Sequence, residues 1–140
     1  MSDDFDLTEP ELTAEDLLVL DDPHFGPDGV AVVTGAASGI GQATAVALAA
    51  NGLTVVGADI DEDGLDETAD LAADVDAPGE IRPVETDLTD DTDVDAMIEA
   101  AAGAGDLQYV ANIAGMQHIA SIRPCLVAGG LRGKSVNPWD

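Results

Sequence analysis

The chain has 140 residues, of which 29 are acidic and four are basic, and its net charge of −25 at pH 7 excludes nucleic acid and anionic membranes as expected partners. Hydrophobic residues make up 46% and aromatic residues only 3%, a composition that argues against a disordered chain and predicts a core of small aliphatic side chains. The length suits one domain and is short for a complete dinucleotide-dependent enzyme.

The acids are spread along almost the whole sequence. Molar salt shortens the screening length to about 3 Å and removes most of the repulsion between surface carboxylates. We therefore expect a cytoplasmic protein of a halophile; the alternative, an ordinary acidic protein with an acidic tail, explains this spread less well. The sequence shows neither a secretion signal nor a membrane-spanning run. A single cysteine, Cys125, excludes an internal disulfide and a cysteine-based zinc site, and we expect no metal.

Residues 1–29 are interpreted as an acidic N-terminal extension that ends in the turn-rich sequence DDPHFGPDG. Thr8 and Glu11 have the spacing of a capping box, and the apolar run LLVL follows at 17–20. These features predict one short helix that packs against the domain. For His24, among turn residues, we expect a solvated or capping role rather than metal binding.

Residues 30–118 alternate strand and helix patterns. The apolar run at 30–34 predicts a buried strand. A helix is expected over 39–51, with Ile40, Ala43, Ala47 and Ala50 near its buried stripe and Gly52 as its stop. Further strands are expected at 53–58, 81–85 and 107–111, and further helices at 61–73 (weakened by Gly64) and 91–102 (ended by Gly103 and Gly105). The proline at 83 suggests that its strand lies at a sheet edge.

This order of elements predicts an α/β fold, a Rossmann-type doubly wound parallel sheet of about four strands, with the fourth strand beside the first. Parallel strands bring their carboxyl ends to one edge of the sheet, where such folds bind ligands. Four segments that follow strands should therefore converge there: 35–41, 59, 87–88 and 112–115.

The stretch VAVVTGAASGIG at 30–41 carries most of the functional signal. A strand, a glycine turn and a helix offer a phosphate the free amides and the positive end of a helix N-terminus. Asp59, at the end of the next strand, could accept hydrogen bonds from adenosine ribose hydroxyls and would repel a 2′-phosphate. With no Lys or Arg nearby, NAD is favoured over NADP; the alternative for Asp59 is an exposed loop acid. No Gly-Lys-Ser/Thr follows the glycines, so a P-loop is poorly supported.

These residues resemble the short-chain dehydrogenase/reductase family. TGAASGIG at 34–41 matches its TGxxxGIG loop, Asp59 matches its NAD-selecting acid, Asp87-Leu88 is similar to its adenine-holding pair, and Asn112–Gly115 is similar to its NNAG element, with Ile113 in place of the second Asn. The resemblance implies that NAD is bound by Gly35, Ser38, Gly39, Ile40, Gly41, Asp59, Asp87, Leu88, Asn112, Ala114 and Gly115. Within the family, 115–119 looks most like the D-3-hydroxybutyrate dehydrogenases, which implies that Gln117 contacts a substrate carboxylate; the alternative is a polar loop residue.

The family's catalytic Tyr-x-x-x-Lys does not occur in this sequence. Tyr109, the only tyrosine, falls within the fourth predicted strand, and the only lysine is Lys134. The resemblance implies that the catalytic Ser, Tyr and Lys would lie beyond 140, so no catalytic residue is assigned and this chain alone is expected to be inactive. We therefore expect the NAD-binding portion of an oxidoreductase that transfers hydride to or from an alcohol or ketone, with a 3-hydroxy acid as candidate substrate. The alternative is a non-catalytic dinucleotide-binding or interaction half-domain.

Residues 119–140 depart from the rest of the chain. They contain Arg123, Arg132 and Lys134 but a single acid, Asp140. This change suggests a frameshift or truncation, with an insertion followed by truncation, or a functional basic peptide, as alternatives. The fourth strand would then have an unpaired apolar edge, which favours self-association.

Overall fold

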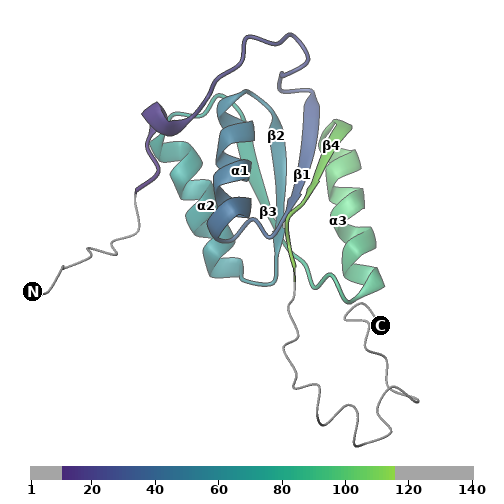
Figure 1. The fold of residues 1–140 in the computed structure, drawn as a ribbon. Coiled ribbons are helices and arrows are strands. Elements are labelled where there is room, and N and C mark those ends of the chain that lie inside the picture. Colours follow the sequence, from purple (N-terminus) through teal and green to yellow (C-terminus); the bar gives the residue numbers. More distant parts are fainter. Residues whose placement is uncertain (1–10, 116–140) are drawn as a thin grey trace, which may run out of the picture.

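Strand β1 (Gly29–Thr34) is the centre of the fold, and all six of its residues are buried. The computed structural model describes residues 11–115. In it, β1 lies between β2 (Thr54–Asp59) and β4 (Asp106–Asn112), and β3 (Glu80–Glu85) pairs with β2, giving the order β3-β2-β1-β4 with all neighbours parallel. The predicted α/β class, the four strands and the place of the fourth strand beside the first are confirmed (Figure 1).

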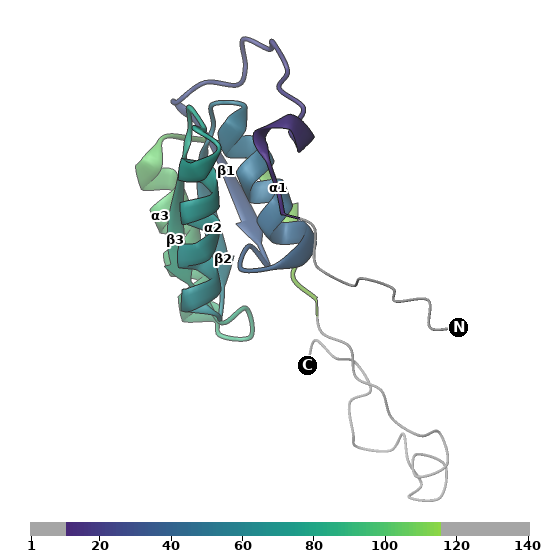
Figure 2. The ribbon, with the colours of Figure 1, turned by 90° about the vertical axis from the view of Figure 1, so that its left-hand side faces the viewer.

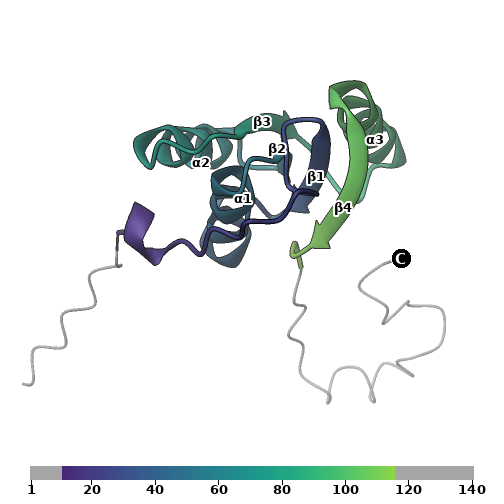
Figure 3. The ribbon, with the colours of Figure 1, turned by 90° about the horizontal axis from the view of Figure 1, so that it is seen from above.

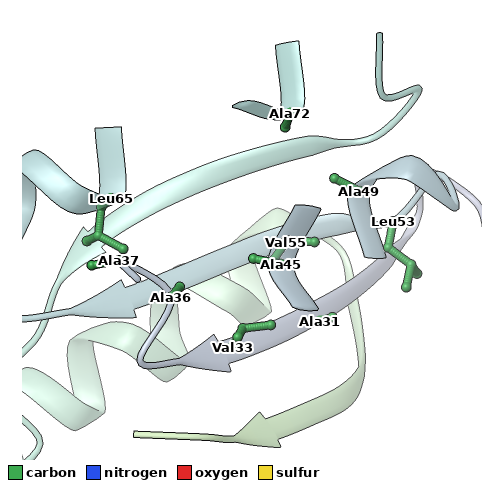
Figure 4. Packing of buried hydrophobic residues seen from close by; sticks show 10 residues of the cluster. All are labelled: Ala31, Val33, Ala36, Ala37, Ala45, Ala49, Leu53, Val55, Leu65 and Ala72. Carbon is green, nitrogen blue, oxygen red and sulfur yellow. The ribbon is translucent and has the colours of Figure 1, made fainter. Parts of the chain in front are cut away.

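Helices cover both faces of this sheet. α1 (Gly39–Ala50) and α2 (Glu62–Asp74) lie on one face, and α3 (Asp91–Ala104) lies on the other (Figures 2 and 3). Each face has its own apolar cluster: Val33, Ala45 and Val55 belong to the first, and Val32 and Met97 to the second. Figure 4 shows ten residues of the first cluster, in which Ala45 and Ala49 of α1 lie over valines of the sheet, and Leu65 and Ala72 come from α2. This two-sided burial explains the continuous apolar runs of the inner strands.

The carboxyl ends of the strands lie level with one another. Thr34, the last residue of β1, is opposite Ala58 of β2 and Asn112 of β4. Asp59, the last residue of β2, is opposite Glu85 of β3. The loops that follow these strands therefore begin at one edge of the sheet, as predicted.

The buried stripe of α1 differs from the prediction. Ile40 is 76% exposed and Ala43 is exposed, so both assignments to the buried face are wrong, whereas Ala50 is buried as expected. The residues that α1 buries are Gly41, Ala45, Val46, Ala49 and Ala50. Four of these five residues are glycine or alanine, and such small residues let the helix axis come close to the sheet. Gly52 follows the C-cap with φ of +95°, which confirms it as the stop.

The structure also tests the predictions made from glycine in α3 and from proline in β3. α3 runs through Gly103 to Ala104 and is capped by Gly105, so the prediction that both glycines lie beyond its end is half right. β3, with Pro83, is an outer strand among the described residues, as predicted.

Over the described residues 11–28, the N-terminal extension does not form the expected packed helix. Between residues 11 and 28 its only helical element is a single turn, η1 (Ala14–Asp16), whose Asp16 carboxylate accepts from the amide and hydroxyl of Thr13. Leu18 is 74% exposed. The reason is tertiary: the Asn51 side chain accepts from the Leu20 amide at 2.6 Å and donates to the Leu18 carbonyl at 2.9 Å, so this backbone pairs with α1 instead of coiling. Thr8, the first residue of the predicted capping box, lies outside the described residues.

Candidate functional site

The loop between β1 and α1 turns sharply at Gly35. Its φ of +72° favours glycine, and a Cβ there would lie 2.9 Å from the amide nitrogen of Ala114. The amides of Gly35 and Ala36 both donate to the Ala58 carbonyl at the end of β2, at 2.8 and 3.2 Å. The turn is thus hydrogen-bonded to β2 and lies against the segment that follows β4, and only a residue without a side chain fits it.

Gly39 and Gly41 serve the same loop in different ways. Gly39 has φ of +56°, and a Cβ there would meet no atom within 4 Å, so its outer side is open. Gly41 is buried, and a Cβ there would overlap the Gly35 carbonyl oxygen and lie 2.5 Å from its carbon. Gly41 therefore allows the first turn of α1 to rest on the loop, while Gly39 leaves space above it.

The N-terminus of α1 gives the site a positive electrostatic character. Ser38 occupies the N-cap position with an extended backbone, yet its side chain makes no capping hydrogen bond. The first amides of a helix have no intrahelical acceptor, and the helix dipole places positive charge there. Ser38, Gly39 and Ile40 are all exposed. A hydroxyl, unpaired helical amides and open space above Gly39 together suit an anionic group such as a phosphate.

Asp59 is joined directly to the glycine loop. Its Oδ2 accepts from the Ala37 amide at 3.2 Å, and its Oδ1 accepts from the Asp61 amide at 3.0 Å. Ala37 and Asp59, distant in sequence, are therefore in contact at the carboxyl ends of β1 and β2. The carboxylate is partly exposed and keeps lone pairs for hydroxyl donors of a ligand.

Thr34 joins the loop to the segment after β4. Its buried Oγ1 accepts from the amides of Ile113 at 3.1 Å and Ala114 at 3.2 Å. Asn112 and Gly115 are exposed on either side of this contact. The structure thus brings the predicted residues 35–41, 59 and 112–115 into one connected site.

Asp87 and Leu88 lie at the same edge, in the connection from β3 to α3. The Thr86 amide donates to the Asp59 carbonyl at 2.8 Å, which places this connection beside the end of β2. The hydroxyl of Thr89, 2.6 Å from Asp87 Oδ1, and its amide, at 2.9 Å, hold the pKa of Asp87 below 3.8. Asp87 is therefore ionised at neutral pH.

The described part of the chain shows no group of three or more His, Cys, Asp or Glu side chains that could hold a metal ion. His24 is exposed, and its Nδ1 lies 2.8 Å from Asp22 Oδ1 within a turn. Over residues 11–115, no helix is both long and apolar enough to span a bilayer. Gln117, the predicted substrate contact, and the tail 119–140 lie outside the described residues.

Two residues that belong to this edge were missing from the predicted site. Thr34 supplies the link to β4, and its place at the end of a buried strand was the available signal. Ile60 is 66% exposed directly after Asp59. Ile40, 76% exposed, and Leu88, 42% exposed, also lie in segments that follow strands at this edge. An apolar residue next to a strand-end acid was the signal for Ile60.

The sequence profile of the family described as short chain dehydrogenase matches residues 29–125. The chain is 44% identical over 93 residues to a short-chain dehydrogenase of Penicillium roqueforti, covering 64% of this chain and 34% of that protein. It is 45% identical over 98 residues to 1-deoxy-11-beta-hydroxypentalenate dehydrogenase of Streptomyces avermitilis, covering 66% of this chain and 34% of that protein. The chain spans about a third of the length of these curated relatives.

Comparison with solved structures also finds similarity to short-chain dehydrogenases. A short chain dehydrogenase from Mycobacterium smegmatis superposes with a TM-score of 0.64 at 33% identity, over 76% of this chain and 45% of that one. A short chain dehydrogenase/reductase from Burkholderia phymatum, solved in complex with NAD, superposes with a TM-score of 0.51 at 40% identity, over 58% of this chain and 28% of that one. The region matched by the family profile contains every strand of the described fold and the whole connected edge, and this chain belongs to the short-chain dehydrogenase family.

Proposed function

We propose that this chain is the NAD-binding portion of a short-chain dehydrogenase, an oxidoreductase that transfers hydride to or from an alcohol or ketone. The observation that carries the proposal is the hydrogen bond from the Ala37 amide to the Asp59 carboxylate. It places the ribose-binding type of acid against the phosphate-binding type of loop, as a dinucleotide site requires.

The residues present fit the cofactor at its phosphate end. Ser38 supplies a hydroxyl that makes no capping hydrogen bond, the first turn of α1 supplies amides, and the open side of Gly39 supplies room. A side chain at Gly35 or Gly41 would meet backbone atoms, so the compact loop itself depends on both glycines. Asn112, Ala114 and Gly115 border the loop on the β4 side, where we place the nicotinamide ribose.

The adenosine end of the cofactor is assigned to the β2–β3 side. Ile60 and Leu88 offer exposed apolar surface for a base, and the ionised Asp87 can accept hydrogen bonds from it. Asp59 favours ribose hydroxyls and repels a 2′-phosphate. Among the described residues Arg82 is the only base, and its guanidinium is paired with Glu80 at 2.6 Å near the start of β3. These charges favour NAD over NADP.

The bound cofactor supplies hydride chemistry, and this chain's residues supply binding and orientation. Asp59 fixes one end through the ribose, and the Thr34 contact with Ile113 and Ala114 fixes the backbone at the other. We assign no proton-transfer residue to this chain, since it has no Tyr-x-x-x-Lys. A 3-hydroxy acid is the candidate substrate, with Gln117 as its carboxylate contact.

The test is a calorimetric titration of the full chain with NAD and with NADP in molar KCl. We expect NAD to bind more tightly and Asp59→Ala to remove most of that preference, with Asp66→Ala, an exposed acid on α2, as the matched control. NAD-linked oxidation of 3-hydroxybutyrate should be undetectable with this chain alone. Absence of binding to either cofactor would overturn the proposal. Measurable turnover by this chain alone would show that it does contain a proton-transfer residue.

We also propose that the outer edge of β4 associates with another copy of the chain. Among the described residues, the other outer strand, β3, contains Pro83 and carries Glu80, Arg82 and Glu85, whereas β4 carries one charged residue, Asp106. Charge and proline protect free strand edges, so β3 is protected and β4 is not. Sedimentation velocity in molar KCl should show dimers that Val110→Lys weakens; a monomer at all concentrations would contradict this.

A further inference from the structure

The hydroxyl of Thr68 is a fully buried polar group beneath the glycine loop. Thr68 lies on α2 and is 0% exposed, and its Oγ1 is 2.7 Å from the Ala36 carbonyl oxygen and 2.9 Å from that of Gly64. Gly64 precedes it by one helical turn, so the second contact is the ordinary one for threonine inside a helix. The contact with Ala36 is different, because it crosses from α2 to the loop.

Gln42, on α1, completes the arrangement. Its Nε2 donates to Thr68 Oγ1 at 3.1 Å and to the Ala37 carbonyl at 3.3 Å, which uses both amide hydrogens. The hydroxyl has one hydrogen, so when it points to Ala36 the bonds run in one direction, from Gln42 through Thr68 to the loop. Hydrogen bonds in such a chain strengthen one another.

α2 also touches the loop directly at Gly64. A Cβ there would lie 2.8 Å from both the Cβ and the carbonyl oxygen of Ala37. The glycine that weakens the helical pattern of α2 is therefore the residue that lets the helix reach the loop. Gly64 and Thr68, four residues apart, lie on the same face of α2.

We infer that Thr68 and Gln42 are positioning residues that set the shape of the loop at Ala36 and Ala37. The Ala36 carbonyl accepts a hydrogen bond from Thr68 and the Ala37 carbonyl accepts one from Gln42, while the Ala37 amide donates to Asp59. The arrangement holds the Ala36–Ala37 peptide through both its carbonyl and its amide, and the following peptide through the Ala37 carbonyl. It therefore sets the direction in which the first amides of α1 point. Its effect on cofactor affinity rests on the proposed function; its effect on loop order does not.

The test compares Thr68→Val, which keeps the shape of the side chain and removes the hydroxyl, with Thr68→Ser, which keeps the hydroxyl. Loss of a hydrogen bond to the loop should weaken NAD binding by about tenfold in Thr68→Val and leave Thr68→Ser near the parent. The matched control is Thr54→Val, a buried threonine whose hydroxyl bonds to the Pro27 carbonyl near the start of β2. It should leave NAD binding unchanged.

Amide hydrogen exchange of the full chain gives a second readout that needs no cofactor. In Thr68→Val the amides of Gly35 and Ala37 should exchange faster, by about the same factor as the loss in affinity, while Thr54→Val should leave them unchanged. Gln42→Leu should act in the same direction, and it serves if Thr68→Val does not fold. Combined with Thr68→Val, it should add less than its separate effect.

The outcomes separate the two hypotheses. A parent chain that fails to bind NAD overturns the proposed function, and the exchange rates then decide the positioning role alone. Unchanged exchange at Gly35 and Ala37 in both Thr68→Val and Gln42→Leu overturns the positioning role, whatever the cofactor does. Equal loss of affinity in Thr68→Ser and Thr68→Val would also overturn it, because the hydroxyl would then have no part.

Discussion

Replacing Gly41 by alanine tests the packing of α1 on the glycine loop. Gly41 is inside a helix with an ordinary negative φ, where a change from glycine to alanine normally stabilises by about 1 kcal/mol. The added Cβ would overlap the Gly35 carbonyl oxygen and lie 3.1 Å from the Ala36 nitrogen. Because these are backbone atoms, the helix or the loop must move, at a cost of about 1–3 kcal/mol.

Gly103→Ala is the matched control for this substitution. Gly103 is also helical, in the last turn of α3, and a Cβ there would meet nothing within 4 Å. The helix-propensity gain is common to both variants, so the difference between their free energies of unfolding isolates the steric cost. In urea unfolding, we expect Gly103→Ala to be more stable than the parent chain, and Gly41→Ala to be about 1–3 kcal/mol less stable than Gly103→Ala. For a chain of this size each kcal/mol corresponds to a shift in Tm of about 4 °C. Equal stabilisation by both substitutions would refute the close approach of α1 to the loop.

Three further predictions concern charge and the extension. Thr89→Val should raise the pKa of Asp87 toward its usual value of 3.8 in a carboxyl-carbon NMR titration, because it removes the hydroxyl donor. In the parent chain, the hydrogen bond from Thr89 stabilises the fold above pH 3.8. That contribution is lost as the pH falls through the lowered pKa of Asp87 in the folded state. Asn51→Ala should speed proteolysis within 11–28 more than global unfolding, since Asn51 bonds to the backbone of Leu18 and Leu20. The free energy of unfolding should rise with KCl up to molar concentration as carboxylate repulsion is screened; full stability at low salt would contradict the expectation of a halophile.

The positions of the strands and helices could be predicted from local sequence patterns. The sheet edge where the candidate site lies could be predicted from the order of these elements. Short apolar runs and a C′ glycine such as Gly52 act through the chain's own backbone, so they can be recognised without knowledge of packing. The convergence of Gly35, Asp59 and Asn112 required only the rule that parallel strands end together. These features depend on neighbours in sequence or on topology, and both were available.

The features that sequence patterns missed depend on contacts between distant segments. The LLVL run suggested a packed helix, but Asn51, more than thirty residues away, pairs with that backbone in extended form. Ile40 was assigned to the buried stripe of α1 by its helical spacing with Ala43, Ala47 and Ala50, yet it is exposed in the first turn of the helix. Thr68 and Gly64 gave no functional signal, because their role depends on how closely α2 approaches the loop.

The alanine content of the chain has a consequence for the site as well as for the core. Ala45 and Ala49 on α1 pack against Ala31, Val33 and Val55 of the sheet, where small side chains allow close approach of helix and strands (Figure 4). The same helix must rest its first turn on the Gly35 carbonyl while its amides stay open to a ligand. A bulkier residue at either alanine would force the helix away from the sheet and lift its N-terminus from the loop. The small residues of this core and the glycines of the loop therefore satisfy one geometric requirement, the closeness of α1 to the carboxyl end of β1.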